Sequence, residues 1–173
     1  MDYQFCKRRK GRIRNFEDRF KEALNYASKH HAGQTRMGGE PYITHPMEVS
    51  EMLRNQGLGT DYQIAGLFHD LLEDTDATVE MIELIGGHKV LEAVKLVTKE
   101  PGYKMWNYIH RIKANPIAFA VKGADRLHNL QCALIAPDDF KRRYIKETEE
   151  WYMDFSKEIP EALEVLKASL EEK

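Results

Sequence analysis

Apolar residues recur every three or four positions along most of the chain, which is the spacing of one face of an amphipathic helix. The first such segment runs from about Asn15 to His31. Its apolar positions are Phe16, Phe20, Ala23, Leu24 and Ala27. No segment shows the sustained alternation of apolar and polar residues that is typical of a half-buried strand. The pattern therefore predicts an all-α fold.

Turn residues divide the next part of the chain into further helices. The glycine-rich stretch 33–41 is expected to be a loop, and the helix after it begins near Pro46 and stops near Gly57. Thr60 or Asp61 is expected to cap the helix that follows, which is the central helix of the chain.

The second half of the chain carries the same kind of signals. Further helices are predicted at about 78–85, 90–99, 105–114 and 116–134. From Pro137 onward, aromatic and aliphatic residues recur among many charges, which predicts one long or one broken amphipathic helix. Pro160 is the position at which such a helix could kink.

The central helix carries the stretch 66–75, which changes from apolar to strongly acidic within about one turn. On a continuous helix, His69 lies one turn from Glu73, and Asp70 lies one turn from Asp74. Two neighbouring rows of the helix would then each carry a pair of potential ligand or proton-transfer groups. The simpler alternative is a helix end that leaves the core with its carboxylates solvated, because buried carboxylates are costly unless paired or metal-bound.

His45 and Asp125 are two further polar residues that the predicted helices would hold in fixed places. His45 directly precedes Pro46, which suits the first turn of a helix, so His45 lies at a helix N-terminus. Asp125 falls within a largely apolar helix and shares a side of it with Lys122 and Asn129. An ordinary exposed polar stripe would have the same spacing, but a carboxylate in a buried helix needs a partner.

These polar residues make a candidate set of metal ligands. The set consists of His45, His69, Asp70 and Asp125. Two imidazoles and two carboxylates suit a divalent transition ion such as Mn, Fe or Zn. A lone histidine is more often structural than a ligand, but four groups in this order are more specific than any one of them. The same central helix would supply acid/base groups, Glu73 and Asp74, beside its two ligands.

The length and composition fit one domain with a short tail. The chain has 173 residues, of which 42% are hydrophobic and 31% charged, so a core can form, and the composition argues against wholesale disorder. Residues 1–14 are expected to be a basic N-terminal tail and residues 15–173 the folded domain. The net charge of −2 argues against broad nucleic-acid binding, and the basic run 7–12 is better interpreted as a solvated tail than as a binding arm.

Cysteine usage and hydropathy indicate a cytoplasmic protein that does not cross a membrane. The two cysteines, Cys6 and Cys132, lie far apart and have no metal or redox spacing, which fits a reducing compartment. No apolar run approaches the ~20 residues that span a bilayer. The N-terminus also lacks the apolar core of a signal peptide.

Five short motifs follow one another in an order that resembles the hydrolase domains of the RelA/SpoT family. They are His31-Ala32-Gly33-Gln34-Thr35-Arg36, Pro41-Tyr42-Ile43-Thr44-His45-Pro46, His69-Asp70-Leu71-Leu72-Glu73-Asp74-Thr75, Val97-Thr98-Lys99 and Val121-Lys122-Gly123-Ala124-Asp125-Arg126-Leu127-His128-Asn129. These domains belong to the HD superfamily of metal-dependent phosphohydrolases. The resemblance covers about residues 20–130 and is strongest to the small, hydrolase-only members, which include the metazoan SpoT homologues.

The resemblance implies a single all-helical HD domain that removes the 3′-pyrophosphate from guanosine tetra- or pentaphosphate. It implies Mn²⁺ as the usual cofactor, with other divalent transition metals as alternatives, and a small nucleotide as the partner. The implied metal ligands are His45, His69, Asp70 and Asp125. Glu73 and Asp74 would orient or deprotonate the attacking water and assist the leaving group. The implied substrate-binding residues are Arg36 on the base, Tyr42 near the sugar, Lys122, and Asn129 on the nucleoside.

Two departures from the family pattern concern the nucleotide side of the site. Met37 stands where the family often has Lys, and Gln131-Cys132 stands where it often has Arg-Thr. Guanine preference therefore stays open, and the alternative substrates are adenosine polyphosphates, NADPH or a pyrophosphorylated tRNA end. A nucleotide sensor without activity is a further alternative, although it would not need Glu73 and Asp74. The simplest alternative is a helical protein whose histidines only fill a core.

Overall fold

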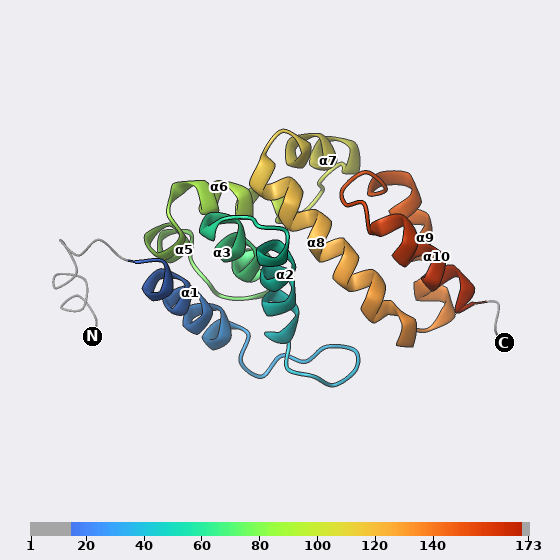
Figure 1. The fold of residues 1–173 in the computed structure, drawn as a ribbon, viewed down its shortest axis with the longest axis horizontal. Coiled ribbons are helices and arrows are strands. Elements are labelled where there is room, and N and C mark those ends of the chain that lie inside the picture. Colours follow the sequence, from blue (N-terminus) through green and yellow to red (C-terminus); the bar gives the residue numbers. More distant parts are fainter. Residues whose placement is uncertain (1–14, 171–173) are drawn as a thin grey trace.

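The computed structural model describes residues 15–170, and every element of regular secondary structure within that range is a helix (Figure 1). In chain order they are α1 (Phe16–His30), α2 (Thr44–Asn55), α3 (Thr60–Phe68), α4 (Leu71–Asp74), α5 (Val79–Gly86), α6 (His88–Val97), α7 (Met105–Lys113), α8 (Pro116–Cys132), the 3₁₀ turn η2 (Ala133–Ile135), α9 (Asp138–Trp151) and α10 (Ile159–Ala168). The predicted all-α class is confirmed. The predicted basic tail, 1–14, lies outside the described residues.

Helix α8 is the central element of the bundle. It begins sharply because the Asn115 side chain accepts hydrogen bonds from the amides of Ile117 and Ala118, both at 3.0 Å, while Pro116 occupies the first turn. It packs against α2, α3 and α6 on one side and against α7 and α10 elsewhere, as its diagonal path in Figure 1 shows. Its buried apolar residues are Ile117, Ala118, Val121, Ala124, Leu127 and Leu130. The helix therefore connects the N-terminal helices α2, α3 and α6 with the helices α7 and α10.

Helices α2 and α3 pack unusually close together. A Cβ atom added at Gly66 would lie 2.9 Å from Leu53 Cδ1 and 3.2 Å from the backbone of Ser50, so only glycine fits without a shift. The contact is anchored by Leu53, Ile64, Leu67 and Phe68, all fully buried. Burying side chains of this size stabilises a fold by about 1.5–3 kcal/mol each. The close approach brings the N-terminus of α2 next to the C-terminus of α3.

The structure corrects two expectations for the helix predicted to begin at Thr60 or Asp61 and to carry the stretch 66–75. The predicted cap at Thr60 or Asp61 is wrong, because Gly59 is the N-cap and Thr60 is already helical. The predicted continuous helix is also wrong, because α3 ends at Phe68 and Asp70 becomes the N-cap of the short helix α4. The His69 ring explains the break, since its Nδ1–H donates at 2.8 Å to the Gly66 carbonyl that a continuing helix would offer to the next amide.

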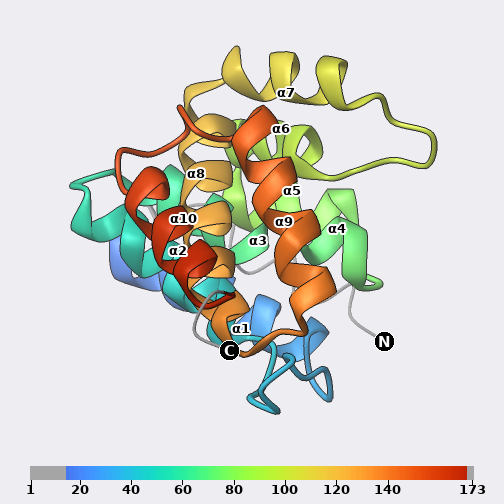
Figure 2. The ribbon, with the colours of Figure 1, turned by 90° about the vertical axis from the view of Figure 1, so that its right-hand side faces the viewer.

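The C-terminal region forms two helices, so the alternative of a broken helix is correct, but the break is not at Pro160. Helix α9 ends at Trp151, and the irregular segment 152–158 separates it from α10. Pro160 lies in the first turn of α10, where its missing N–H has no helical partner to lose. Figure 2 shows α10 in front of α8, with α9 packed beside α10. No helix within residues 15–170 is both long and apolar enough to cross a membrane.

Gly123 provides a test of how α8 meets the segment after α9. A Cβ at this position would lie 2.5 Å from the Phe155 carbonyl oxygen, so Gly123→Ala must displace that backbone. Overpacking of this kind costs about 1–3 kcal/mol, partly offset by about 1 kcal/mol from the better helix propensity of Ala. The expected net loss is measured by urea unfolding. A Gly123→Ala variant that is as stable as the wild type, or more stable, would contradict this packing.

Candidate metal centre

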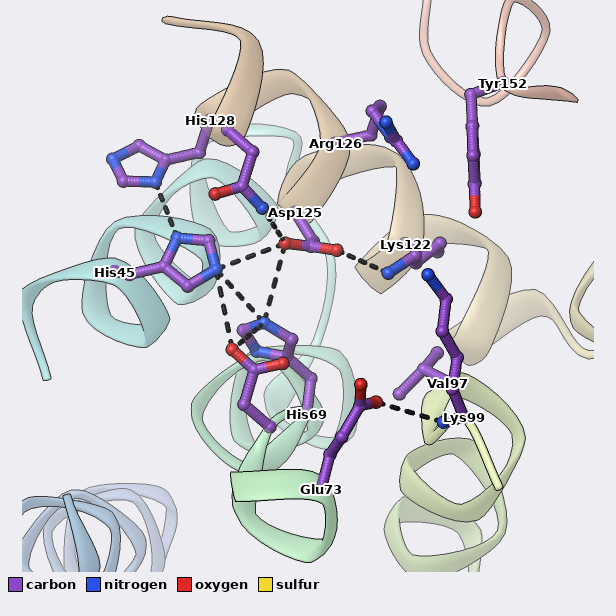
Figure 3. Close-up of polar contacts among 12 residues, drawn as sticks. His45, His69, Glu73, Val97, Lys99, Lys122, Asp125, Arg126, His128 and Tyr152 are labelled. Carbon is purple, nitrogen blue, oxygen red and sulfur yellow. Dashed lines mark hydrogen bonds and ion pairs between the residues drawn. The ribbon is translucent and has the colours of Figure 1, made fainter. Parts of the chain in front are cut away.

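Four polar side chains from three separate places in the chain meet between α2, α3 and α8 (Figure 3). His45 Nε2 lies 3.2 Å from His69 Nε2 and 3.1 Å from Asp125 Oδ1, and His69 Nε2 lies 2.9 Å from Asp70 Oδ2. Ligand atoms of His45, His69 and Asp70 all fall within 4.8 Å of one another. Asp125 Oδ1 adds a further oxygen 3.7 Å from His69 Nε2. The structure thus brings all four predicted ligands together.

The ligand side chains have the orientation that a metal needs. His69 sits directly after α3, and its Nδ1–H donates to the Gly66 carbonyl, which leaves Nε2 free to face the cluster. His45 is the second residue of α2, and its Nε2 faces the cluster from the other side. Such secondary hydrogen bonds fix ring orientation at metal sites. The arrangement of donors therefore fits a bound cation.

Burial and mutual charge strongly perturb the titration of the cluster. His45 and His69 are only 1% and 2% exposed. Burial lowers the pKa of His45. Burial works in the same direction on His69, but the charge of Asp70 and a hydrogen bond to Asp125 overcome it and raise the pKa of His69 to about 10. Burial would raise the pKa of Asp70, but the charge of His69 holds it at about 2.

Asp125 is held by two neighbours on its own helix. Lys122 Nζ donates to Oδ2 at 2.7 Å, and Asn129 Nδ2 donates to Oδ1 at 2.5 Å. Burial opposes ionisation, but the Lys122 charge keeps the pKa of Asp125 well below its usual value. Both neighbours were expected to bind substrate, whereas here they contact Asp125, a candidate ligand. Asn129 also accepts a hydrogen bond from Arg36 Nη2 at 2.8 Å, so the loop before α2 is tied to α8.

Tyr42 links the ligand cluster to one of the two predicted catalytic carboxylates. Its hydroxyl lies 2.7 Å from Asp70 Oδ2 and 3.2 Å from Asp74 Oδ2, so it can donate to either oxygen. Burial and the nearby Asp70 raise the pKa of Tyr42, which keeps the hydroxyl protonated. Burial and the charge of Asp70 also raise the pKa of Asp74. The Arg36 guanidinium lies 5.8 Å from the centre of the Tyr42 ring.

Glu73 occupies a separate position from Asp74. Its Oε2 accepts a hydrogen bond from the Lys99 amide at 3.0 Å, as Figure 3 shows, and the residue is exposed. Neither Glu73 nor Asp74 belongs to the three-residue cluster found within residues 15–170. Both carboxylates therefore lie beside the ligands without being among them.

Three residues near the cluster were not singled out from the sequence. His128 Nδ1 lies 2.7 Å from His45 Nδ1. His31 Nδ1 donates to Gln34 Oε1 at 2.7 Å, and Gln34 Nε2 donates to the Asp74 carbonyl at 2.8 Å. All three lie inside motifs that were noted, but their chemistry depends on partners that only the fold identifies.

An all-helical domain around a buried His, His and Asp cluster is the class of protein that these observations define. The sequence matches the HD domain family over residues 23–158, so the chain belongs to that family. It is 34% identical over 165 residues to the bifunctional (p)ppGpp synthase/hydrolase SpoT of Escherichia coli, covering 89% of this chain and 23% of that protein. It is 36% identical over 143 residues to the guanosine-3′,5′-bis(diphosphate) 3′-pyrophosphohydrolase of Aquifex aeolicus, covering 78% of this chain and 20% of that protein.

The chain thus spans less than a quarter of the length of these curated relatives. A solved structure of a metazoan orthologue of SpoT that hydrolyses ppGpp is similar in size to the chain itself. The two superpose with a TM-score of 0.72 at 25% sequence identity, covering 88% of this chain and 95% of that one. The HD membership predicted from the motifs is therefore confirmed.

The metal centre is tested by removing one ligand at a time. His69→Ala and Asp125→Asn are expected to lose the single divalent ion that the wild-type chain is expected to bind, because the first removes a donor nitrogen and the second removes the charge of a donor oxygen. Metal content per chain is measured after loading with Mn²⁺ and removal of free ion. His88→Ala is the control, since His88 is exposed on α6. Full metal content in both ligand variants would refute the site.

Proposed function

We propose that the chain is a metal-dependent hydrolase that removes the 3′-pyrophosphate of (p)ppGpp, giving GDP or GTP and pyrophosphate. The observation that carries the proposal is the cluster of the buried His45 and His69 with the half-buried Asp70, with a pair of carboxylates, Glu73 and Asp74, beside it. The relatives named as (p)ppGpp hydrolases, and the structural likeness to a ppGpp-hydrolysing SpoT orthologue, support the substrate. A sensor without activity would not need the carboxylate pair.

The cofactor that we propose is Mn²⁺, with other divalent transition ions as alternatives. His45, His69, Asp70 and Asp125 would hold it, since they supply two imidazole nitrogens and two carboxylate oxygens, all from buried positions except the half-buried Asp70. When bound, the ion supplies Lewis acidity, which polarises a phosphoryl oxygen and makes a water molecule more acidic.

Glu73 and Asp74 would share the proton transfers. Water attacks the phosphorus next to the 3′-oxygen, a new P–O bond forms, and the bond from that phosphorus to the 3′-oxygen breaks. Glu73 would take the proton of the water, a role supported by its exposure and by the Lys99 amide that orients its carboxylate. Asp74 would deliver a proton to the departing 3′-oxygen, a role that suits a carboxyl group whose pKa burial has raised.

The remaining site residues would position the substrate and the acid. Tyr42 holds Asp74 in place through its hydroxyl. Arg36 is the residue that we propose stacks on the nucleobase, because a guanidinium plane lies on an aromatic face better than an ammonium does. Its bond to Asn129 would then open when nucleotide binds. Cytoplasmic localisation is part of the same proposal, as the expected place of a nucleotide hydrolase with this cysteine usage.

The direct test is a panel of nucleotides incubated with the Mn²⁺-loaded protein. Release of pyrophosphate from ppGpp and pppGpp, with GDP and GTP as the co-products, is the expected result. A protein that binds the metal but releases neither phosphate nor pyrophosphate from any member of the panel would refute a hydrolase.

A second candidate is the same chemistry on another nucleotide, such as an adenosine polyphosphate or NADPH. The observation that favours it is Met37, which is 60% exposed on the loop that carries Arg36, where the family often has Lys. If a missing cation at this position weakens guanine recognition, Met37→Lys is expected to raise kcat/KM for guanine over adenine substrates. Equal ratios of kcat/KM for the variant and the wild type would argue against this role of the loop.

The acid and base roles are separated from ligand roles by isosteric substitutions. Glu73→Gln keeps size but removes the base, so it is expected to leave metal content unchanged and to lower kcat by about 10²–10⁴-fold. KM should change little, because the lost interaction belongs to the transition state. Asp74→Asn is expected to behave similarly, with a smaller loss if orientation is its main role. Wild-type turnover in both variants would leave only the alternative of a solvated helix end.

A further inference from the structure

We propose that His128 is a positioning residue of the metal centre, which holds His45 in the orientation and tautomer that a metal ligand needs. The inference rests on the proposed metal site and adds a residue that the ligand set does not contain. His128 lies on α8 three residues after Asp125. It would act on the metal only through His45, not as a ligand itself.

The contact between the two imidazoles is short and well oriented. Their Nδ1 atoms lie 2.7 Å apart, and the rings are within 25° of parallel, with centres 4.9 Å apart. Figure 3 shows His128 on the outer side of His45, away from the cluster. The other nitrogen of His45, Nε2, faces Asp125 and His69 at 3.1 and 3.2 Å. The two nitrogens of the His45 ring therefore face different partners: Nδ1 faces His128, and Nε2 faces the cluster.

Proton placement follows from this geometry. An imidazole that gives the lone pair of Nε2 to a cation carries its hydrogen on Nδ1. That hydrogen is then donated to His128 Nδ1, whose own hydrogen must be on Nε2. His128 Nε2 lies 3.6 Å from Cys132 Sγ, a weak acceptor. A line of side chains thus runs from the cluster through His45 and His128 to Cys132.

The two ligand histidines differ in how this outer hydrogen bond is made. His69 donates to a backbone carbonyl, that of Gly66, which no substitution at another position can remove. His45 relies on a side chain, so its orientation depends on the residue at position 128. Asp125, His128 and Cys132 follow one another along α8 at the spacing of one side of the helix. One rigid helix therefore supplies both a ligand and the support of another ligand.

The test compares two substitutions of His128 with a surface control. His128→Phe keeps a ring but removes the acceptor, whereas His128→Gln supplies a side-chain oxygen that can accept from His45. We expect the Kd for Mn²⁺, measured by calorimetry, to rise about 10–100-fold in His128→Phe, the usual effect of losing such a support. We expect His128→Gln to restore most of the affinity. The control, His88→Phe on α6, should bind as the wild type does.

A second measurement reports the tautomer directly and needs no turnover. Nitrogen-15 shifts of the His45 ring in the Zn²⁺-loaded protein should show the hydrogen on Nδ1 in the wild type and His128→Gln. In His128→Phe the shifts of the His45 ring should no longer show the hydrogen on Nδ1 alone. Metal-free unfolding of each variant verifies that the fold is retained, and if His128→Phe does not fold, His128→Leu takes its place in the same comparison.

The outcomes separate this inference from the proposed function. Unchanged Mn²⁺ affinity in a folded His128→Phe, or equal losses in the Phe and Gln variants, would overturn the positioning role while the hydrolase proposal stands. Normal metal binding with the expected losses, but no hydrolysis of any nucleotide, would overturn the hydrolase proposal alone. A wild-type chain that binds no divalent ion would overturn both.

Discussion

The buried carboxylate of Asp125 is the interaction on which the centre of the molecule depends. A carboxylate out of contact with water is costly unless it is paired and hydrogen-bonded. Asp125 meets this cost with Lys122 on one oxygen and with Asn129 on the other, and His45 Nε2 lies 3.1 Å from that second oxygen. Because His45 lies in the first turn of α2 while the other residues belong to α8, these contacts join the two helices. The fold and the site are stabilised by the same contacts.

The site therefore has little separation between the residues that hold the ligands and those expected to hold a nucleotide. Asn129 contacts both Asp125 and Arg36, and Tyr42 contacts both Asp70 and Asp74. A nucleotide that draws Arg36 away changes the partners of Asn129, which in turn supports a ligand. In the proposed site, the residues for metal and for substrate therefore share contacts, so a substitution in the loop 33–41 would disturb both sets.

Much of the fold could be predicted from the sequence, because helical spacing, a cap such as Asn115 and glycine turns act locally. The meeting of the four candidate ligands could also be predicted, since their residue types and order are specific. The break after Phe68 could not, because the apolar spacing continues through it and the cause is a side chain that takes a backbone carbonyl. The role of His128 was equally hidden, because its contact with His45 joins residues 83 positions apart.

The break and the close packing at Gly66 together explain why the cluster forms at this place. Without a side chain at Gly66, α3 approaches the backbone of α2 closely enough for His45 and His69 to bring their Nε2 atoms within 3.2 Å. The carbonyl of the same residue then accepts the His69 Nδ1–H, which turns the other nitrogen toward the cluster. Ending the helix there lets Asp70 change direction and place its carboxylate 2.9 Å from His69. A larger residue at position 66 would still offer its carbonyl to His69, but its Cβ would push α3 away from α2, so the glycine sets the separation of the two candidate ligands.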